Sequence, residues 1–300
     1  MDLALLALLA ALLTAVCQSA TDLGTKAATR DADDRAILAV QWSAGALLLT
    51  LACLVQYPAL ATEPRETLAA LAKPGFWRLL AWSSALNVVT YALYIRAFRL
   101  SDASLVAPLV LLTPVLMLVT SPIMVGERVP PLGALGVVFT VLGVGLLDAG
   151  QADGRRFNFA VFARDKGARA MIATAVIWSV TANLDKLGVQ ASTPLIWIAA
   201  VTIVIALCAV LYWAAGRRRR PRLYDLRYAV LAGSAMAFGN AVQMWALTVL
   251  LTPYVIAIKR LSALFTVLAS GVVLKENTGG RFLGAAVMLL GAVMIAVARG

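Results

Sequence analysis

Apolar residues are gathered along this chain into ten stretches, separated by short segments that hold charged residues, prolines and glycines. A helix rises 1.5 Å per residue, so about twenty residues cross the roughly 30 Å of hydrocarbon in a bilayer. The stretches lack the apolar–polar alternation of barrel strands, and backbone groups in lipid must be paired within the segment. The pattern therefore predicts ten transmembrane helices, at residues 3–27, 36–57, 76–98, 103–125, 131–149, 168–190, 193–215, 226–249, 252–274 and 280–298.

Composition supports this assignment. Of the 300 residues, 62% are hydrophobic and 14% are charged, whereas a soluble domain is nearer half apolar and a quarter charged. We therefore expect an all-α integral membrane protein with the lipid bilayer as a partner. The net charge of +11 lies largely in connectors, such as Arg217 to Arg220, where lipid headgroups and membrane topology account for it. Nucleic acid is not an expected partner.

Several kinds of chemistry lack their usual residues. There is no histidine, and Cys17, Cys53 and Cys208 all lie inside apolar stretches, so we expect no metal site, cofactor or catalytic residue. ATP-driven pumping by this chain is not expected, because a Gly-x-x-x-x-Gly-Lys-Ser/Thr loop is absent. The first stretch lacks a basic start, which favours a transmembrane helix over a cleaved signal peptide.

The sparse polar residues recur in the same order in both halves of the chain. A threonine precedes a lysine by five residues, a glutamate closes a later stretch, and two glycines seven residues apart follow it. These residues are Thr21, Lys26, Glu127, Gly136 and Gly143 in one half and Thr181, Lys186, Glu276, Gly284 and Gly291 in the other. The sequence thus predicts two five-helix domains, at 1–150 and 151–300. Because five crossings is an odd number, the second copy enters the membrane from the opposite side, which is an inverted-topology repeat.

The repeated residues suggest structural roles. Glycines of the fifth and tenth stretches are predicted to allow close helix contact, with tolerated helix glycines as the alternative. They are Gly133, Gly136, Gly143, Gly145, Gly284 and Gly291. Glu127 and Glu276 stand at segment ends, and we interpret them as caps or hinge anchors rather than cargo ligands.

These motifs together resemble the drug/metabolite transporter superfamily, EamA type. The resemblance extends over the whole chain and is carried by Lys26, Lys186, Pro114, Gly126, Glu127, Glu276, Gly136 and Gly284. One departure is Ala263 in the ninth helix, where the fourth helix has Pro114. The resemblance implies a transporter, and members of this type are often exporters of amino acids or related metabolites.

Ionisable residues inside membrane helices are costly unless paired or hydrated, so each is a candidate for function. Lys259 and Arg260 lie about 10 Å into the ninth stretch when counted from Thr252. The pair resembles the phosphate-binding pair of the triose-phosphate and nucleotide-sugar translocators, and Arg and Lys both suit carboxylate or phosphate. The alternative is an internal salt bridge with Asp22 or Asp185.

Other polar residues complete the predicted substrate site. Asp22 and Lys26 are spaced for a pair on one helical face, although Lys26 near a helix end could equally snorkel. Asp185 and Lys186 are candidates for a gate or cargo contact. The neutral candidates are Asn87, Trp178, Asn240 and Gln243. Their alternative role is hydrogen bonding between helices. The tryptophans nearer segment ends are expected to be interfacial anchors: Trp42, Trp77, Trp82, Trp197 and Trp213.

The surplus of basic over acidic residues inside the stretches favours cargo with a carboxylate or phosphate. We therefore expect a secondary carrier, an exporter or exchanger, for an amino acid, organic acid or phosphorylated metabolite, working by alternating access. Coupling to protons or exchange stays open, with Asp22 and Asp185 as the protonatable groups. The alternative is an integral membrane enzyme acting on lipid or isoprenoid phosphates, although a nucleophile beside a base and clustered acids for a metal are both lacking.

The protein is expected in the bacterial inner membrane, as a monomer or homodimer. Two observations on its orientation conflict. Five Lys and Arg are assigned to membrane segments: Lys26, Arg96, Lys186, Lys259 and Arg260. Of the other 21, 16 lie in odd-numbered loops, and this excess of positive charge places those loops in the cytoplasm and both termini outside. The family resemblance implies that both termini are inside.

Overall fold

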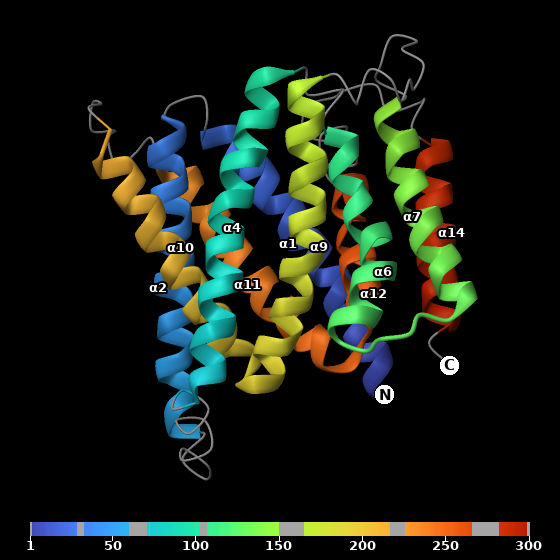
Figure 1. The fold of residues 1–300 in the computed structure, drawn as a ribbon, viewed down its shortest axis with the longest axis horizontal. Coiled ribbons are helices and arrows are strands. Elements are labelled where there is room, and N and C mark those ends of the chain that lie inside the picture. The colour runs from blue at the N-terminus through green and yellow to red at the C-terminus, as the bar shows by residue number, and fades with distance from the viewer. Residues whose placement is uncertain are drawn as a thin grey trace. The chain divides into compact units, whose positions relative to one another are not determined.

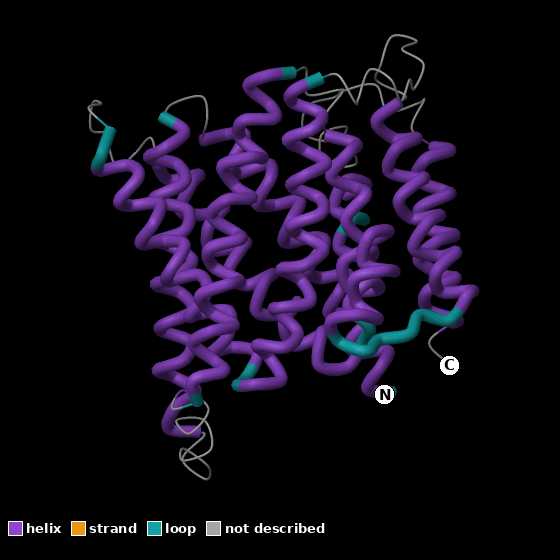
Figure 2. Tube along the Cα trace, in the orientation of Figure 1, coloured by secondary structure: helices purple, strands orange, loops and turns teal. Residues whose placement is uncertain are grey.

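A computed structural model describes residues 2–28, 33–59, 71, 73–101, 107–149, 165–216, 226–265 and 282–298. Helices form nearly all of this part of the chain, and no strand occurs in it (Figure 2). The elements are α1 (Leu3–Ala28), α2 (Asp34–Ala59), α4 (Pro74–Leu100), the 3₁₀ helix η2 (Ala107–Leu111), α6 (Leu112–Met124), α7 (Pro131–Ala149), α9 (Lys166–Ala191), α10 (Pro194–Ala214), α11 (Arg227–Val249), α12 (Thr252–Lys259) and α14 (Phe282–Ala298). Each of the ten predicted stretches contains a helix in its described part (Figure 1), and the all-α prediction is confirmed. Residues 103–106 of the fourth stretch and 266–274 of the ninth lie outside the described residues.

Four described helices are long and apolar enough to cross a bilayer. They are α1 over Leu3–Thr25, α2 over Arg35–Gln56, α10 over Pro194–Ala214 and α11 over Arg227–Val249. Large apolar side chains also cover the outside of these helices, since Leu54, Val55 and Leu211 are 63%, 78% and 69% exposed. Water would disfavour such a surface, whereas lipid suits it.

The chain packs into two compact units, and each unit draws on both halves of the sequence. Unit 1 comprises Met1–Leu8, Leu86–Asn183 and Leu250–Gly300, and unit 2 comprises Leu9–Ala85 and Leu184–Val249. Helices α1, α4 and α9 therefore contribute residues to both units. The predicted boundary between the two sequence repeats, at 150/151, lies outside the described residues.

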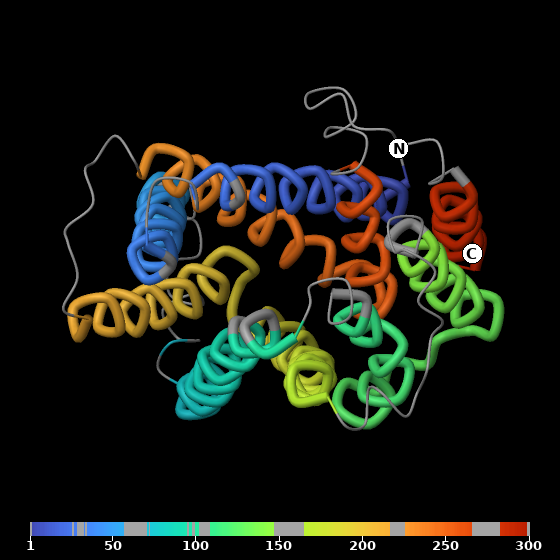
Figure 3. Tube along the Cα trace, turned by 90° about the horizontal axis from the view of Figure 1, so that it is seen from above, coloured from blue at the N-terminus to red at the C-terminus, as the bar shows by residue number. Residues whose placement is uncertain are grey.

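Glycines bring α7 and α14 together in unit 1, where the two helices lie side by side (Figures 1 and 3). A Cβ atom added at Gly136 would lie 2.8 Å from the carbonyl oxygen of Gly291, and one at Gly143 would lie 2.7 Å from that of Gly284. Any larger side chain would therefore press on the facing backbone. The prediction that these seven-spaced glycines serve helix packing is confirmed.

Two other glycines of the fifth helix do not join this contact. A Cβ at Gly145 would meet nothing within 4 Å, so its predicted packing role is wrong. Gly133 instead lies against the hydroxyl group of Tyr254 on α12. The helical period explains the difference, because positions 136 and 143 are seven residues apart and share a face, whereas 145 points elsewhere.

Small residues also allow close contacts in unit 2. A Cβ at Gly239 of α11 would lie 2.6 Å from the Cβ of Cys17 on α1, and Gly233 of α11 lies against the backbone of Gln41 on α2. The Thr14 hydroxyl donates to the Gly239 carbonyl at 3.3 Å. Helix α11 is thereby held close to both α1 and α2.

The fourth and ninth helices both change geometry part of the way along. The α-helical part of the fourth begins at Leu112, after the 3₁₀ turn η2. Helix α12 ends at Lys259, and the turn that follows is closed by a hydrogen bond from the Leu261 N–H to the Ile258 carbonyl at 2.9 Å. Helical geometry resumes over 262–265. These changes, at 111/112 and 260/261, are separated by the same 149 residues as Glu127 and Glu276.

The change does not require a proline at position 114 or at its equivalent in the ninth helix. Pro114 lies in the first turn of α6, where an N–H group has no intrahelical partner and proline is tolerated. The ninth helix has Ala263 at the corresponding position and is interrupted nevertheless. Ala263, which departs from the family pattern by replacing a proline, therefore leaves the ninth helix interrupted all the same.

Asp165 connects the start of α9 to the end of α4. Its carboxylate accepts hydrogen bonds from the Ser101 hydroxyl and, at 2.7 Å, from the Ala168 N–H. The bond from Ser101, followed by that from Ala168, lowers the pKa of this carboxyl below its usual value. Asp165 thus caps the first turn of α9 in the manner of an N-cap aspartate.

Enlarging a glycine at the α7–α14 contact should destabilise the protein. For Gly143→Ala, the new methyl group meets backbone atoms that cannot rotate away, and overpacking of this kind costs about 1–3 kcal/mol. We expect a lower midpoint of thermal unfolding in detergent. Gly145→Ala is the matched control on the same helix and should unfold at or above the wild-type temperature, because its methyl group meets nothing and alanine favours a helix more than glycine does. Equal melting of both variants would contradict the close contact.

Candidate functional site

The ten predicted site residues divide between the two compact units. Unit 1 holds Lys259, Arg260, Asn87 and Trp178, and unit 2 holds Asp22, Lys26, Asp185, Lys186, Asn240 and Gln243. The side chain of Lys26 and the whole of Glu276 lie outside the described residues.

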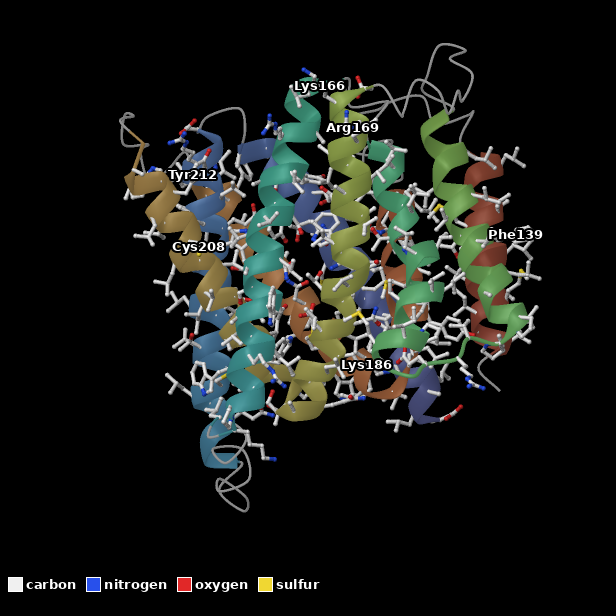
Figure 4. All side chains as sticks on the ribbon, viewed as in Figure 1. Phe139, Lys166, Arg169, Lys186, Cys208 and Tyr212 are labelled. Atoms are coloured by element: carbon white, nitrogen blue, oxygen red, sulfur yellow. The ribbon has the colours of Figure 1, made fainter. Side chains whose placement is uncertain are left out.

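Asp185 is the polar centre of unit 2. Its Oδ1 atom accepts a hydrogen bond from the Ser83 hydroxyl of α4 at 3.1 Å and one from the Trp197 indole Nε1 of α10 at 3.0 Å. A single carboxylate of α9 therefore joins two neighbouring helices. The next residue, Lys186, is only 9% exposed and lies toward the C-terminal end of α9, far from Lys166 and Arg169 (Figure 4).

Trp197 is a site residue that the sequence prediction missed. It was expected to be an interfacial anchor, but its side chain is fully buried and donates to Asp185, so that expectation is wrong. Gly188 makes room for the indole ring, because any Cβ there would collide with it. Phe76 packs edge-on against the same ring at 5.8 Å between centroids. A signal for this contact was present in the sequence. Asp185 and Gly188 are three residues apart and share one face of α9, so an acceptor stands beside a space that a large ring can fill.

Three other predicted residues of unit 2 lie on α1 and α11. The Asp22 carboxylate accepts from Gln18 Nε2 of the same helix at 2.8 Å, on an exposed part of α1. Gln243 is 5% exposed and Asn240 is half-buried, both on α11. The face of α11 that Asn240 and Gln243 were predicted to share is therefore buried at Gln243 and half-buried at Asn240.

In unit 1, the cationic pair lies at the interruption of the ninth helix. Lys259 is the last residue of α12, and Arg260 occupies the turn that follows. Both side chains are half-buried. A cation in the last turn of a helix is favoured by the partial negative charge of the exposed carbonyl groups. The interruption therefore accommodates two positive charges inside an apolar segment.

An aromatic cluster surrounds Trp178 in the same unit. Its ring lies 6.0 Å from that of Tyr91 and 5.6 Å from that of Tyr94, both on α4. Asn87, Tyr91 and Tyr94 follow at i, i+4 and i+7, so they share one face of α4. The two tyrosines were not singled out from the sequence, although this helical spacing marks them.

Asn183 forms a second polar connection that the sequence analysis did not single out. Its amide donates to the Thr120 hydroxyl at 3.0 Å and to the Ser179 carbonyl at 2.7 Å, and its oxygen accepts from the Ser121 hydroxyl at 2.7 Å. Asn183, Ser121 and Ser179 are all fully buried. Because its amide is bonded in this way, Asn183 ties α6 to α9 and has a structural role.

Glu127 caps a helix, as predicted, but the helix belongs to the other repeat. Gly126 ends the fourth segment with φ of 75°, a left-handed conformation that suits glycine. Glu127 then turns inward, and its Oε2 accepts from the Thr252 N–H at the start of α12 at 2.7 Å. The Gly-Glu motif thus connects the end of the fourth helix to the beginning of the ninth.

Candidate ligands for a metal are not grouped in the part of the chain that the structure describes. No three His, Cys, Asp or Glu side chains there lie close enough to hold an ion. The chemistry available consists of cationic groups, neutral hydrogen-bond donors and the carboxylates of Asp22 and Asp185.

The helices, the apolar exposed surface and the buried charges define a multi-pass integral membrane protein. The EamA-like transporter family matches the sequence over residues 5–147 and 165–297, which together make up most of the chain. The chain therefore belongs to the EamA-like transporter family and has its two-repeat architecture. The resemblance inferred from the sequence is confirmed.

A solved crystal structure, described only as that of a protein, has the same fold. It aligns with a TM-score of 0.78 and 18% identity, over 97% of this chain and 96% of the other. At this identity the likeness concerns the fold alone. No curated protein matches the sequence significantly.

Loss of the Glu127 carboxylate should weaken the link between the fourth and ninth helices. We expect Glu127→Ala to lower stability by about 1 kcal/mol, the usual cost of a lost N-cap, while Glu127→Gln keeps an oxygen acceptor and loses less. Thermal unfolding in detergent measures both. Arg128→Ala, at the exposed neighbouring position, is the control. Three identical melting curves would show that the cap contributes nothing.

Proposed function

We propose that this protein is a secondary carrier that moves a small anionic or zwitterionic metabolite across the membrane by alternating access. The cargo class is an amino acid, an organic acid or a phosphorylated metabolite. It acts as an exporter or exchanger in the bacterial inner membrane, as a monomer or homodimer. Membership of a transporter family supports the general activity, and the intramembrane charges support the cargo class.

The observation that carries this proposal is the interruption of the ninth helix at Lys259 and Arg260. Carriers built from repeats bind their solutes where membrane helices are discontinuous, because an interruption exposes backbone groups that a continuous helix would occupy. Here the interruption follows Lys259 directly, about 10 Å from the start of α12. A cationic pair at this position suits a carboxylate or phosphate, to which Arg offers a planar fork and Lys a compact charge.

The buried charge of Lys186 supports the same cargo class from unit 2. An ammonium group inside a membrane helix is retained when it serves an ion or substrate pathway. Asp185 beside it offers a negative charge, which would suit the ammonium group of a zwitterion. The residues proposed to bind cargo are therefore Lys186, Lys259 and Arg260, with Asp185, Asp22, Lys26, Asn87, Trp178, Asn240 and Gln243 as further contacts.

Removing either cation of the ninth helix should abolish transport. We expect Lys259→Ala and Arg260→Ala to insert and fold, yet to carry no cargo in reconstituted liposomes, because each loses a direct contact with the anion. Arg128→Ala removes an exposed cation and should transport at the wild-type rate. Wild-type transport by both variants would end the cationic-site proposal, whereas failure of both to fold would favour a structural salt bridge.

A screen of metabolites should identify the cargo. Measured as thermal stabilisation of the purified protein, binding should favour anionic and zwitterionic compounds over lipophilic cations, because a third positive charge near Lys259 and Arg260 is repelled. Quaternary ammonium compounds as the best ligands would overturn the cargo class. Uptake of the best ligand without chemical turnover would separate a carrier from a membrane enzyme acting on lipid phosphates.

A further inference from the structure

We infer that the cargo of this carrier is an acid with a planar aromatic ring, whose ring packs against Trp178 while its acid group meets Arg260. The inference rests on the proposed transport function and narrows its cargo class. The residues that would bind the cargo all lie in unit 1, on α4, on α9 and at the end of α12.

Trp178 lies at an unusual depth for a tryptophan of a membrane helix. It stands twelve residues from the start of α9 at Lys166 and thirteen from its end at Ala191, which is about 18–20 Å from the two ends. Tryptophan and tyrosine of membrane proteins gather at the interfaces, where the polar atom of the ring meets water. Carriers built from repeats bind their solutes near the middle of the bilayer. The depth of Trp178 therefore suits a solute site better than an anchor.

Two tyrosines of α4 extend the Trp178 ring into an aromatic cluster. The Tyr91 ring lies 6.0 Å from it with the ring planes at 76°, and the Tyr94 ring lies 5.6 Å from it with the planes at 43°. Neither tyrosine is stacked flat on the indole, and all three side chains are half-buried, so part of each ring is accessible. Aromatic rings attract one another in edge-to-face and offset arrangements, so a ring of the cargo can join this cluster.

Contacts within unit 1 set the directions of the helices around Trp178. Leu109, just before α6, packs in one cluster with Met171 of α9. Further along both helices, the Ser121 hydroxyl of α6 donates to the Asn183 side chain of α9. The contacts advance together along the two segments, so the fourth helix and α9 run in the same direction (Figures 1 and 3).

Helix α12 runs the opposite way. It begins beside the end of α6, where the Glu127 carboxylate accepts from the Thr252 N–H. One turn further on, Ile256 packs in a buried cluster with Met117 of α6 and Ala182 of α9. The contacts step backward along α6 as they step forward along α12, so α12 is antiparallel to α6 and hence to α9.

This arrangement brings Trp178 and Arg260 to the same level. Trp178 precedes Ala182 by one turn, and Arg260 follows Ile256 by one turn. Because the two helices are antiparallel, both residues lie about 6 Å from the buried cluster, toward the same side. The Arg260 N–H bonds to the Ile256 carbonyl at 3.3 Å, which continues the helical course of α12 to this residue. Residues four apart share a helical face, so the indole and the guanidinium belong to the faces that meet in this cluster.

An acid with an aromatic ring fits this combination of groups. The guanidinium of Arg260 offers a planar fork to a carboxylate, and its five N–H donors let it serve a cargo oxygen while it keeps contacts with the protein. A ring joined to that carboxylate through a short linker would lie beside Trp178. Attraction between aromatic rings adds to the burial of their area, and an aliphatic acid of equal size lacks this addition.

Binding of two matched carboxylates to the whole purified chain tests the inference. Phenylacetate and cyclohexylacetate carry the same acid group, and the cyclohexyl group is at least as apolar, so burial by itself gives phenylacetate no advantage. We expect phenylacetate to bind about two- to tenfold more tightly to the wild type. Trp178→Leu should abolish this ratio, whereas Trp82→Leu, at a position of α4 that is 62% exposed, should keep it. Equal affinities in the wild type, or an unchanged ratio in Trp178→Leu, overturn the inference.

Fluorescence quenching adds a measurement on a variant that keeps an aromatic ring at the site. The probe 4-nitrophenylacetate quenches a tryptophan that it touches, so it should quench the wild type and Trp82→Phe in a saturable manner. Trp178→Phe should lose this saturable quenching while it still binds phenylacetate. Quenching that persists in Trp178→Phe overturns the inference, and this holds even where Trp178→Leu fails to fold.

Uptake into liposomes recognises failure of the proposed function separately. A wild type that binds phenylacetate selectively through Trp178 but moves no acid would contradict transport and leave the ring site in place. Equal transport of phenylacetate and cyclohexylacetate by both the wild type and Trp178→Leu would support transport and overturn the ring site. Arg260→Ala should weaken binding of both carboxylates to the same extent, and unchanged binding of both would overturn the contact assigned to Arg260.

Discussion

Lipid offers no hydrogen-bond partner, and this constraint shapes where many polar groups of the protein lie. Backbone groups are paired inside helices, and several hydroxyl groups within those helices are paired in the same way. Thr21, Thr90, Thr140 and Thr174 each donate to the carbonyl group one turn earlier, at 2.6–3.0 Å. Polar side chains that reach another helix, such as Asn183, connect elements distant in sequence. The same pairing that satisfies polar groups therefore also holds the bundle together.

Where few polar groups can pair between helices, close packing of the backbones holds the helices together. Helices α7 and α14 contain few groups able to bond across the contact, and four glycines allow their backbones to approach. Lipid is as apolar as leucine, so burying leucines would add little to helix association in a membrane. Short distances between backbones add dispersion contacts that lipid cannot match. Several large side chains of α14, Leu283 and Val297 among them, remain on the exposed surface.

The two repeats share a geometry at the fourth and ninth helices but differ in charge there. The fourth and ninth helices both change geometry at corresponding positions. Val110 and Leu111 precede the change in the fourth helix, whereas Lys259 and Arg260 occupy it in the ninth. A symmetric scaffold thus supplies two similar interruptions, of which one carries cations. Asp185 and Lys186 add a second charged position, on the sixth of the ten helices.

The sequence by itself determined the ten helices, the repeat and the membrane environment, because hydrophobic length and charge order are local properties of the chain. It also marked Glu127 as a cap and Gly143 as a packing residue, since each follows from spacing along one helix. Only the tertiary structure decided which partner each residue meets. Glu127 caps a helix more than a hundred residues away, and Trp197 bonds Asp185 instead of anchoring at the interface. Spacing reveals the face on which a residue lies, whereas its neighbour depends on which helix packs against that face.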